Sequence, residues 1–321
     1  MLFENYQVAR RRITFVTQFS LLALAIPLTS CKKTGTPAAK ASTAEYASPE
    51  DAGAALLTAT KSDDQSQMIS IFGPDAKQII SSGDAVQDKA VIASFATAYG
   101  AMHRWRAMTD GSETLIVGAD NFPFPIPLKK NAAGKWFFDS AAGKEEVLAR
   151  RVGRNELTTI QVAQAVGNAQ TEYFSKLHDG ETVKEYATKF ISDPGKQNGL
   201  YWEPIGQAES PLGKLAAFAS SEGYSTHPDE TKPFHGYLYR MLTSQSDKAP
   251  HGAKQYIVNG KMVGGYAMAA YPAEYGNSGV MTFIINQDGL LLQRDLGKST
   301  VETASTMTTF DPTSDWNPAE N

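Results

Sequence analysis

The chain has 321 residues, enough for two domains of ordinary size, and its 42% hydrophobic and 20% charged residues are typical of a folded protein. A formal net charge of -4 argues against nucleic-acid binding, which usually needs a basic face. Because the chain contains one cysteine, it forms no internal disulfide.

The first thirty residues have the pattern of a secretory signal. Three arginines, Arg10–Arg12, precede the mostly apolar segment Ile13–Leu28, and small residues then lead into Cys31. This arrangement resembles the bacterial lipobox, in which a diacylglycerol is attached to the cysteine before cleavage. We therefore expect residues 1–30 to be a lipoprotein signal peptide and Cys31 to be the lipidated start of the mature chain. The alternatives are a free buried cysteine beside an ordinary cleavage site, or a simple membrane anchor.

The residues that follow Cys31 indicate a location. Lys32 stands where an aspartate usually retains lipoproteins of this kind in the inner membrane, so we expect an exported protein that faces the periplasm, at the outer membrane. Removal of residues 1–30 makes the net charge -6, and the expected membrane contact is therefore the lipid on Cys31 rather than charge. Residues 31–48 are small and polar, which is typical of a flexible tether.

Residues 49–140 are predicted to form an N-terminal α+β domain. Ser48 and Pro49 begin a helix, and apolar residues at helical spacing predict two more over 68–72 and 89–102. Residues 113–118 and 134–139 are predicted strands, separated by the proline-rich FPFPIPL. Helices followed by a curved sheet are similar to the cone-shaped fold of nuclear-transport-factor-like domains.

Residues 141–321 are predicted to form a second domain that begins with a long helix over 141–177 and a shorter helix over 211–220. Period-two patterning then predicts antiparallel strands over 236–242, 255–258, 262–271, 279–286 and 290–294. Asn259-Gly260 and Asp288-Gly289 are turn signals between them. A long helix followed by such a meander is similar to the globular part of type IV pilins, although pilins keep their helix at the N-terminus. The expected fold class is therefore α+β, a cone-shaped part joined through a long helix to a pilin-like meander.

Several long motifs occur in order along the chain: WFFDSAAGKEEVLARRVGRNEL (136–157), FHGYLYRMLTSQ (234–245) and YPAEYGNSGVMTF (271–283). Together they resemble the bacterial envelope family catalogued as domain of unknown function 2950. The resemblance covers nearly all of residues 49–312. It implies an exported bacterial protein, and it supplies no catalytic residue, because the family has no established activity.

The common catalytic and metal-binding signatures do not occur in the sequence. It contains neither Cys-x-x-Cys nor His-Glu-x-x-His. GKST at 297–300 lacks the first glycine of a phosphate-binding loop, and GNSG at 276–279 is one residue short of a nucleophile elbow. We therefore expect no cofactor and no metal site.

A first candidate site lies on the predicted long helix. Its members are polar and occupy two turns: Arg150, Arg151, Arg154, Asn155 and Glu156. Residues four apart share a face of a helix, so these guanidinium groups are placed to bind an anion or a carboxylate. Alternatively, they form salt bridges with neighbours such as Glu146 and hold the two parts of the chain together.

A second candidate site surrounds a histidine. His235, Tyr237 and Arg240 lie close together in the sequence, and the histidine is either a general base, a donor to a ligand, or a structural residue at the end of a strand.

A third candidate site is aromatic. Tyr201 and Trp202 are flanked by turn residues, which favours a surface platform that stacks on sugars or packs against peptides, although buried rings would simply be core. Glu274 and Tyr275 add a carboxylate and a ring. One carboxylate does not make the pair that glycoside hydrolysis needs.

Three functions are compatible with these features. The first is a non-enzymatic envelope lipoprotein that binds or scaffolds another envelope protein or a cell-wall polymer. The second is a hydrolase of envelope polymers, which requires His235, Glu274 and the arginines to converge in one cleft. The third is a pilin-like assembly subunit, which requires a polymerising surface.

Overall fold

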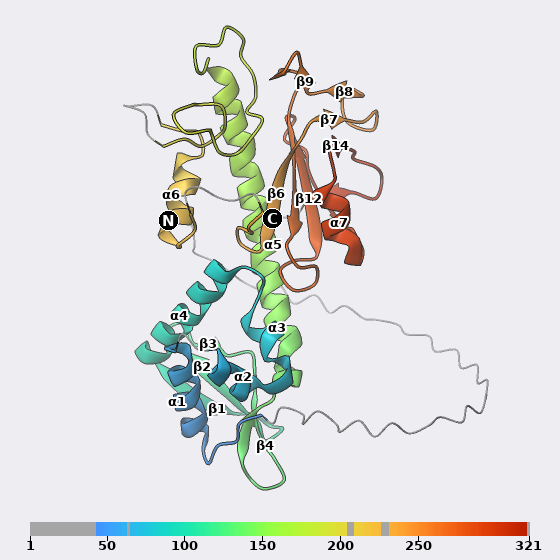
Figure 1. The fold of residues 1–321 in the computed structure, drawn as a ribbon. Helices are drawn as coiled ribbons and strands as arrows, with labels where there is room; N and C mark the ends of the chain where they lie inside the picture. Colours follow the sequence, from blue (N-terminus) through green and yellow to red (C-terminus); the bar gives the residue numbers. More distant parts are fainter. Residues whose placement is uncertain (1–42, 63–64, 204–208, 226–230, 320–321) are drawn as a thin grey trace, which may run out of the picture. The chain divides into compact units, whose positions relative to one another are not determined.

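The computed structural model describes residues 43–62, 65–203, 209–225 and 231–319 (Figure 1). The expected signal peptide, Cys31 and most of the expected tether lie outside these residues. All of the described residues belong to one compact unit, Lys40–Asn321, with an α+β fold. None of the helices in the described ranges has the length and apolar character that crossing a membrane takes.

The N-terminal lobe begins with a group of helices, and two of them start at a side-chain cap. Ser48 Oγ accepts a hydrogen bond from the amide of Asp51, and an Asp84 carboxylate oxygen accepts one from the amide of Gln87. The aspartate cap explains why the helix expected over 89–102 begins four residues earlier. The helices are α1 (Pro49–Thr60), α2 (Ser66–Phe72), the 3-10 turn η1 (Gly73–Asp75), α3 (Ala76–Ile80) and α4 (Ala85–Ala101).

A small antiparallel sheet completes the N-terminal lobe. Its strands are β1 (His103–Ala107), β2 (Glu113–Val117), β3 (Phe122–Pro123), β4 (Leu128–Lys130) and β5 (Trp136–Phe138). The order is β1-β2-β4-β5, and β3 also pairs with β2. The sequence predicted β2 and β5, but not β1, because β1 is short, rich in charged residues and mostly exposed. Leu56, Phe72 and Phe138 lie in the core between helices and sheet.

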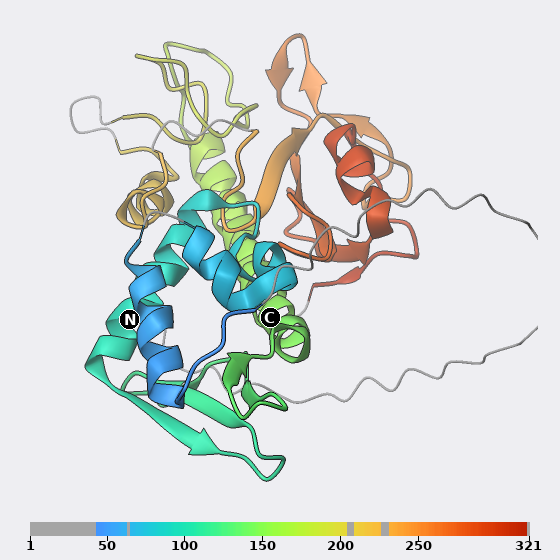
Figure 2. The same cartoon turned by 60° about the horizontal axis from the view of Figure 1, so that its bottom comes forward.

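The long helix α5 (Ser140–Ser175) belongs to both lobes (Figures 1 and 2). Asp139 caps its start by accepting a hydrogen bond from the amide of Ala142. Its first turns contact α3, and its later turns pack against the large sheet of the C-terminal lobe, where Ala163 and Val166 are buried. The sequence predicted this helix over 141–177, two residues past its observed end.

The C-terminal lobe contains a second sheet, antiparallel throughout, in the order β15-β13-β12-β11-β6. Its strands are β6 (Tyr237–Leu242), β11 (Ala267–Pro272), β12 (Met281–Asn286), β13 (Leu291–Asp295) and β15 (Asn317–Pro318). Smaller elements accompany it: α6 (Gly213–Ser221), β7 (Ser244–Gln245), β8 (Lys254–Gln255), β9 (Ile257–Val258), β10 (Lys261–Met262), the 3-10 turn η2 (Gly297–Ser299), α7 (Thr300–Ser305) and β14 (Thr309–Phe310).

Two predicted strands of this lobe prove to be interrupted. The strand expected over 255–258 is divided into β8 and β9, and that over 262–271 into β10 and β11. At the second break Gly264 lies so close to the carbonyl oxygen of Gln255 that a Cβ would stand 2.3 Å from it. This close approach of backbones turns the chain between the hairpin β9–β10 and the sheet.

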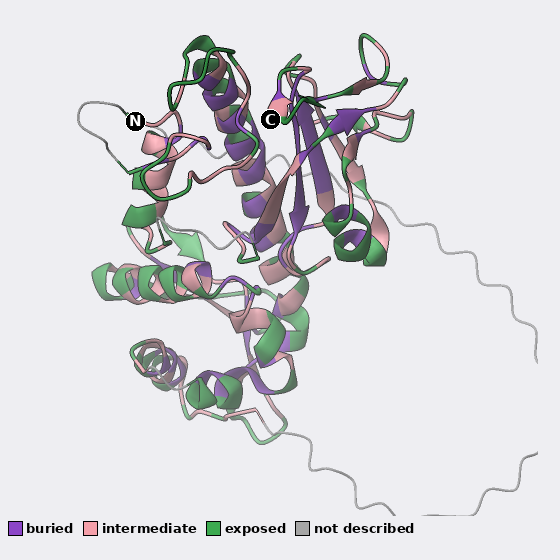
Figure 3. Ribbon diagram, turned by 45° about the horizontal axis from the view of Figure 1, so that its top comes forward, coloured by how far each residue is buried: buried purple, intermediate pink, exposed green. Residues whose placement is uncertain are grey.

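The large sheet is buried on both faces, as the purple strands in Figure 3 show. Met268 and Ile285 share a core with α5, whereas Ala269 and Ile284 share one with Phe310 on the opposite face. All six residues of β11 are buried. Burial on both faces explains the nearly continuous apolar sequence of β11.

Candidate functional site

The N-terminal lobe encloses an open cavity of about 460 Å³ between its helices, its sheet and the first half of α5. Its walls are mainly apolar, with Leu56, Phe72, Ile92, Phe95, Phe124 and Ile126 among the lining residues. Val91 and Phe122 also line it, and both are among the exposed large hydrophobic side chains. A polar end is made by residues of α4 and α5. The volume is within the range of small-molecule sites.

Helix α4 presents an apolar stripe to this cavity. Val91, Phe95 and Ala98 recur at helical spacing, as the sequence predicted, and all three line the cavity. None of them is buried: Val91 is 44% exposed, and the other two are half-buried. Phe95 and Ala98 also pack against the core of this lobe, so the stripe is covered on one side and open to the cavity on the other.

Helix α5 supplies three arginines to the polar end of the cavity, and each has different surroundings. Arg150 Nε donates to Glu146 Oε1 at 2.7 Å, Nη1 donates to the carbonyl oxygen of Pro123, and the guanidinium lies 4.8 Å from the Phe122 ring centroid. The ion pair between Arg150 and Glu146 was predicted from the sequence as the alternative to anion binding.

Arg151 is a structural residue. Its guanidinium donates to the carbonyl oxygens of Gln78, Ile79 and Ser81, at and just beyond the end of α3, and to the side chain of Asn277. A cation at this position satisfies carbonyl groups that have no partner within the helix. Arg151 therefore joins α3, α5 and the loop before β12.

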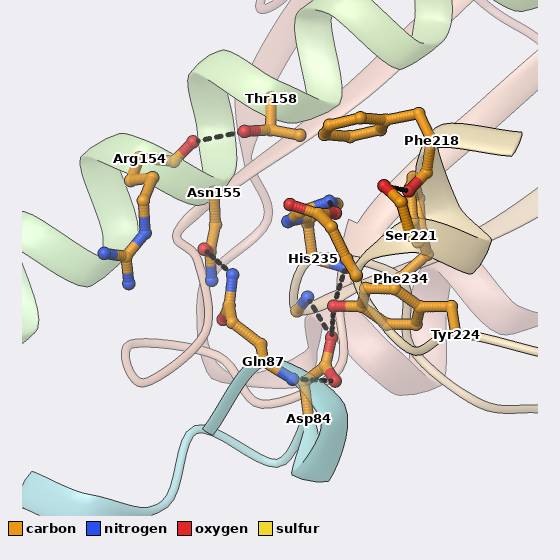
Figure 4. A network of polar contacts seen from close by, with 12 residues as sticks. Asp84, Gln87, Arg154, Asn155, Thr158, Phe218, Ser221, Tyr224, Phe234 and His235 are labelled. Atoms are coloured by element: carbon orange, nitrogen blue, oxygen red, sulfur yellow. Dashed lines mark hydrogen bonds and ion pairs between the residues drawn. The ribbon is translucent and has the colours of Figure 1, made fainter. Parts of the chain in front are cut away.

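Arg154 differs from both, because no hydrogen bond or ion pair reaches its guanidinium from any described residue. The side chain is exposed to solvent, yet the protein surrounds it closely enough for desolvation to lower its pKa. Arginine nevertheless stays protonated. Figure 4 shows its guanidinium apart from the hydrogen-bonded network beside it.

A buried polar network lies next to the cavity (Figure 4). Asp84 is 2% exposed and, besides capping α4, accepts hydrogen bonds at Oδ2 from the hydroxyl of Tyr224 (2.8 Å) and the amide of Gly236 (3.0 Å). The Tyr224 hydroxyl in turn accepts from the amide of His235. One carboxylate thus connects the start of α4 with a turn of the C-terminal lobe.

That turn is a tight hairpin whose two central residues are His235 and Gly236. The amide of Phe234 donates to the carbonyl oxygen of Tyr237, and the amide of Tyr237 donates to the carbonyl oxygen of Phe234. Both central residues have positive φ, 49° and 76°. This conformation suits glycine and is uncommon for histidine, so the surrounding contacts hold it in place.

The residue His235 is 9% exposed, and its imidazole lies among the aromatic rings of Phe218, Tyr224 and Phe234. Its Nε2 is 2.8 Å from Glu222 Oε2. Burial lowers the pKa of His235, although the carboxylates of Glu222 and Asp84 act in the opposite direction; Arg154 adds to the lowering. The neutral ring is therefore the state that the fold favours.

We expect the protein to lose stability between pH 8 and pH 5.5 through His235. The unfolded histidine has a pKa near 6.5, and the folded pKa is lower. As the pH falls below 6.5, the unfolded state therefore binds a proton before the folded state does. The free energy of unfolding is largest above pH 6.5 and decreases as the pH drops through the folded pKa. Urea unfolding at both pH values should show a smaller pH dependence for His235→Asn, since asparagine tolerates positive φ.

His251→Asn is the matched control for this prediction, because His251 also has positive φ (68°) but its side chain is 70% exposed. It should keep the pH dependence of the unaltered chain. If the His235 variant and the unaltered chain show equal pH dependence, the loss of stability at low pH does not come from His235.

Asn155 and Glu156 also bind the two lobes together. Asn155 is fully buried, accepts from Gln87 Nε2 at 2.8 Å and donates to the carbonyl oxygen of Ser278 at 2.8 Å. Glu156 Oε1 accepts from the amides of Val280 and Met281. Both polar residues, expected as ligand contacts or as links between the two parts, act as links.

The exposed aromatic platform is not observed, and the alternative, a ring buried in the core, holds for Trp202. It is 6% exposed and shares the core beneath α5, where its ring and that of Tyr173 have a T-shaped arrangement. Tyr201 is half-buried against the same core. The turn residues around them bend the chain back onto α5 instead of presenting the rings to solvent.

The remaining candidate residues do not join the cavity. Tyr237 is buried and donates to the carbonyl oxygen of Met281, and Arg240 is half-buried in β6. Glu274 is exposed and accepts from the side chain of Asn277, whereas Tyr275 donates to Asp295. The arginines therefore line one cavity that neither His235 nor Glu274 lines, and the convergence needed for a hydrolase is not observed.

Sequence reasoning missed several residues of the network: Asp84, Gln87, Glu222 and Tyr224. The aspartate carried a usable signal, because it directly precedes an apolar-periodic segment, as N-cap residues do. The described residues contain no group of three His, Cys, Asp or Glu side chains that is arranged to hold a metal ion.

Comparison with known proteins gives one match. No curated protein and no solved structure matches this chain. One family model matches residues 43–319, which is most of the chain and includes every residue of the cavity and of the network described above. The family resemblance seen in the sequence motifs is confirmed: the chain belongs to the family described as "Protein of unknown function (DUF2950)".

Proposed function

We propose that this protein is a binding module that takes a small, largely apolar molecule into the cavity of its N-terminal lobe. The observation that carries the proposal is the apolar stripe of α4, which faces about 460 Å³ of open space with Val91, Phe95 and Ala98 only partly covered. Burying this surface against a ligand would remove apolar area from water, which is favourable at roughly 25 cal/mol per Å².

A small ligand fits the geometry better than the polymer expected from the sequence. An exposed aromatic platform would have favoured binding of a polymer, but Trp202 is 6% exposed. The cavity in turn is lined on several sides by α1, α2, α4 and the sheet, as sites for small molecules usually are. A protein partner of the envelope stays compatible with this role.

The proposal predicts saturable binding of an uncharged apolar probe, 1-dodecanol, to the fragment of residues 40–321, which is a compact unit by itself. Calorimetry should give one site per chain. Ala98→Trp places a large ring in the cavity and should weaken binding at least about tenfold. Thr97→Trp, one residue along on the exposed face of α4, should bind as the unaltered chain does. Absence of saturable binding, or unchanged binding by Ala98→Trp, would contradict the proposal.

We also propose that the protein is exported and anchored by lipid on Cys31, at the periplasmic side of the outer membrane. The support is the sequence alone: the arginines, the apolar segment and the small residues before the cysteine. Cys31→Ser should move the protein from the membrane fraction to the soluble periplasmic fraction. Continued membrane association of that variant would show that a different segment anchors the chain.

The order of elements favours two finer fold assignments, which we offer as part of this proposal. Helices packed on a small curved sheet make the N-terminal part similar to the cone of nuclear-transport-factor-like domains, and the meander beside α5 is similar to the globular part of pilins. We further propose the domains 49–140 and 141–321, with α5 as an element that both share.

A further inference from the structure

We infer that the ligand of this cavity carries an anionic oxygen group, a carboxylate or a phosphate on an apolar chain, and that Arg154 binds it. This inference rests on the proposed function, because it assigns the polar end of the same cavity. It identifies a head-group site that the apolar walls alone do not require.

Among the three arginines of the cavity, Arg154 is the one left for a ligand. Arg150 is paired with Glu146 and a carbonyl group, and Arg151 is committed to three backbone carbonyls. None of the described side chains or carbonyls accepts a hydrogen bond from Arg154, although it lines the cavity and is exposed to it. Its planar guanidinium offers paired donors that match a carboxylate or a phosphate.

The charge around Arg154 also favours an anion. A guanidinium that is partly removed from water is stabilised by an opposite charge in its surroundings. The Asp88 carboxylate acts on Arg154 from a distance, but no described residue forms a direct ion pair with it. Two acidic residues, Asp88 and Asp120, also line the cavity. Both carboxylate oxygens of Asp88 are 3.0 Å from the amide nitrogen of Ser82, which donates to them. The Asp88 carboxylate is thus held by backbone away from direct pairing with Arg154.

A second unpaired group lies at the same end of the cavity. Gln87 is 7% exposed; its Nε2 donates to Asn155, whereas its Oε1 has no hydrogen-bond partner within the described part of the chain. A buried acceptor without a partner is costly, and a donor on the ligand or on a water held by it would satisfy the group. An ionised carboxylate has no donor, so it is the cation and the apolar walls, and not this acceptor, that match an amphipathic anion.

The test compares four probes with the same twelve-carbon chain on residues 40–321: dodecanoate, dodecyl phosphate, 1-dodecanol and dodecyltrimethylammonium. We expect both anions to bind at least about tenfold more tightly than the alcohol, and the ammonium probe to bind most weakly. The relative affinity of dodecanoate and dodecyl phosphate distinguishes a carboxylate ligand from a phosphate ligand.

Arg154→Gln should weaken binding of the anions about 10- to 100-fold and leave binding of 1-dodecanol unchanged. Asp88→Asn should tighten anion binding, because it removes a negative charge from the cavity wall. The matched control is Arg104→Gln, which removes an arginine that binds Asn121 and does not line the cavity. Folding of each variant is checked by urea unfolding.

The outcomes separate this inference from the proposed function. If 1-dodecanol binds but the anions gain nothing and Arg154→Gln changes nothing, the cavity binds apolar molecules and the head-group site is wrong. If the ammonium probe binds most tightly, the inferred charge is wrong. If no probe binds, the proposed function fails as well.

Discussion

Asp84→Ala is expected to lower the free energy of unfolding by about 3–5 kcal/mol, one of the two largest effects that we predict. The substitution removes the cap of α4, which by itself contributes about 1 kcal/mol. It also leaves the hydroxyl of Tyr224 and the amide of Gly236 without an acceptor in a buried site, at about 1–2 kcal/mol each. Chemical denaturation followed by circular dichroism measures the loss.

Two further variants make this result specific. Asp84→Asn keeps one acceptor oxygen and should lose less stability than Asp84→Ala. Asp247→Ala removes an exposed aspartate, paired with the neighbouring Lys248, and should change stability by no more than about 0.5 kcal/mol. If Asp84→Ala is as harmless as Asp247→Ala, the carboxylate does not hold the two lobes together.

Gly236→Ala should cost about 3–4 kcal/mol, for two separable reasons. The residue has φ of 76°, where an L side chain is strained by about 1–2 kcal/mol. In addition, the new Cβ would stand 2.5 Å from Asn155 Nδ2 and 3.0 Å from Ser278 Cβ. The asparagine cannot move aside easily, because it is fully buried and bound at both ends of its amide.

The chain contains a close control for this variant. Gly252 also follows a histidine of positive φ, has the same φ of 76°, and a Cβ there would meet nothing within 4 Å. Gly252→Ala should therefore cost only the backbone strain, about 1–2 kcal/mol. Equal losses for the two glycine variants would show that the contact with Asn155 is unimportant.

The sequence predicted the elements that local patterns define. The apolar spacing along α5 and the Asn259-Gly260 turn were sufficient for a long helix and a hairpin, and both are observed. The two-residue strands β7 and β14 could not be predicted, because their pairing joins residues about 65 positions apart, such as Ser244 and Thr309. No local preference exists in so short a segment.

The candidate site was predictable only in part, for the same reason. Helical spacing correctly grouped Arg150 and Arg154, but it could not show which guanidinium would be used by the fold and which left free. The bond from Gly236 to Asp84 spans 152 positions, and no sequence pattern connects the two. Turn residues around Trp202 indicated a surface position. They do not reveal that the chain folds back onto α5, and the prediction therefore missed the burial of this ring.

An NMR titration of residues 40–321 with 1-dodecanol shows whether the N-terminal lobe binds an apolar ligand in its cavity. We expect saturable shifts of the α4 amides of Val91, Phe95 and Ala98, and no shift of Ile284 in the C-terminal sheet. Shifts confined to the C-terminal lobe, or no saturable shift at all, would contradict binding in this cavity.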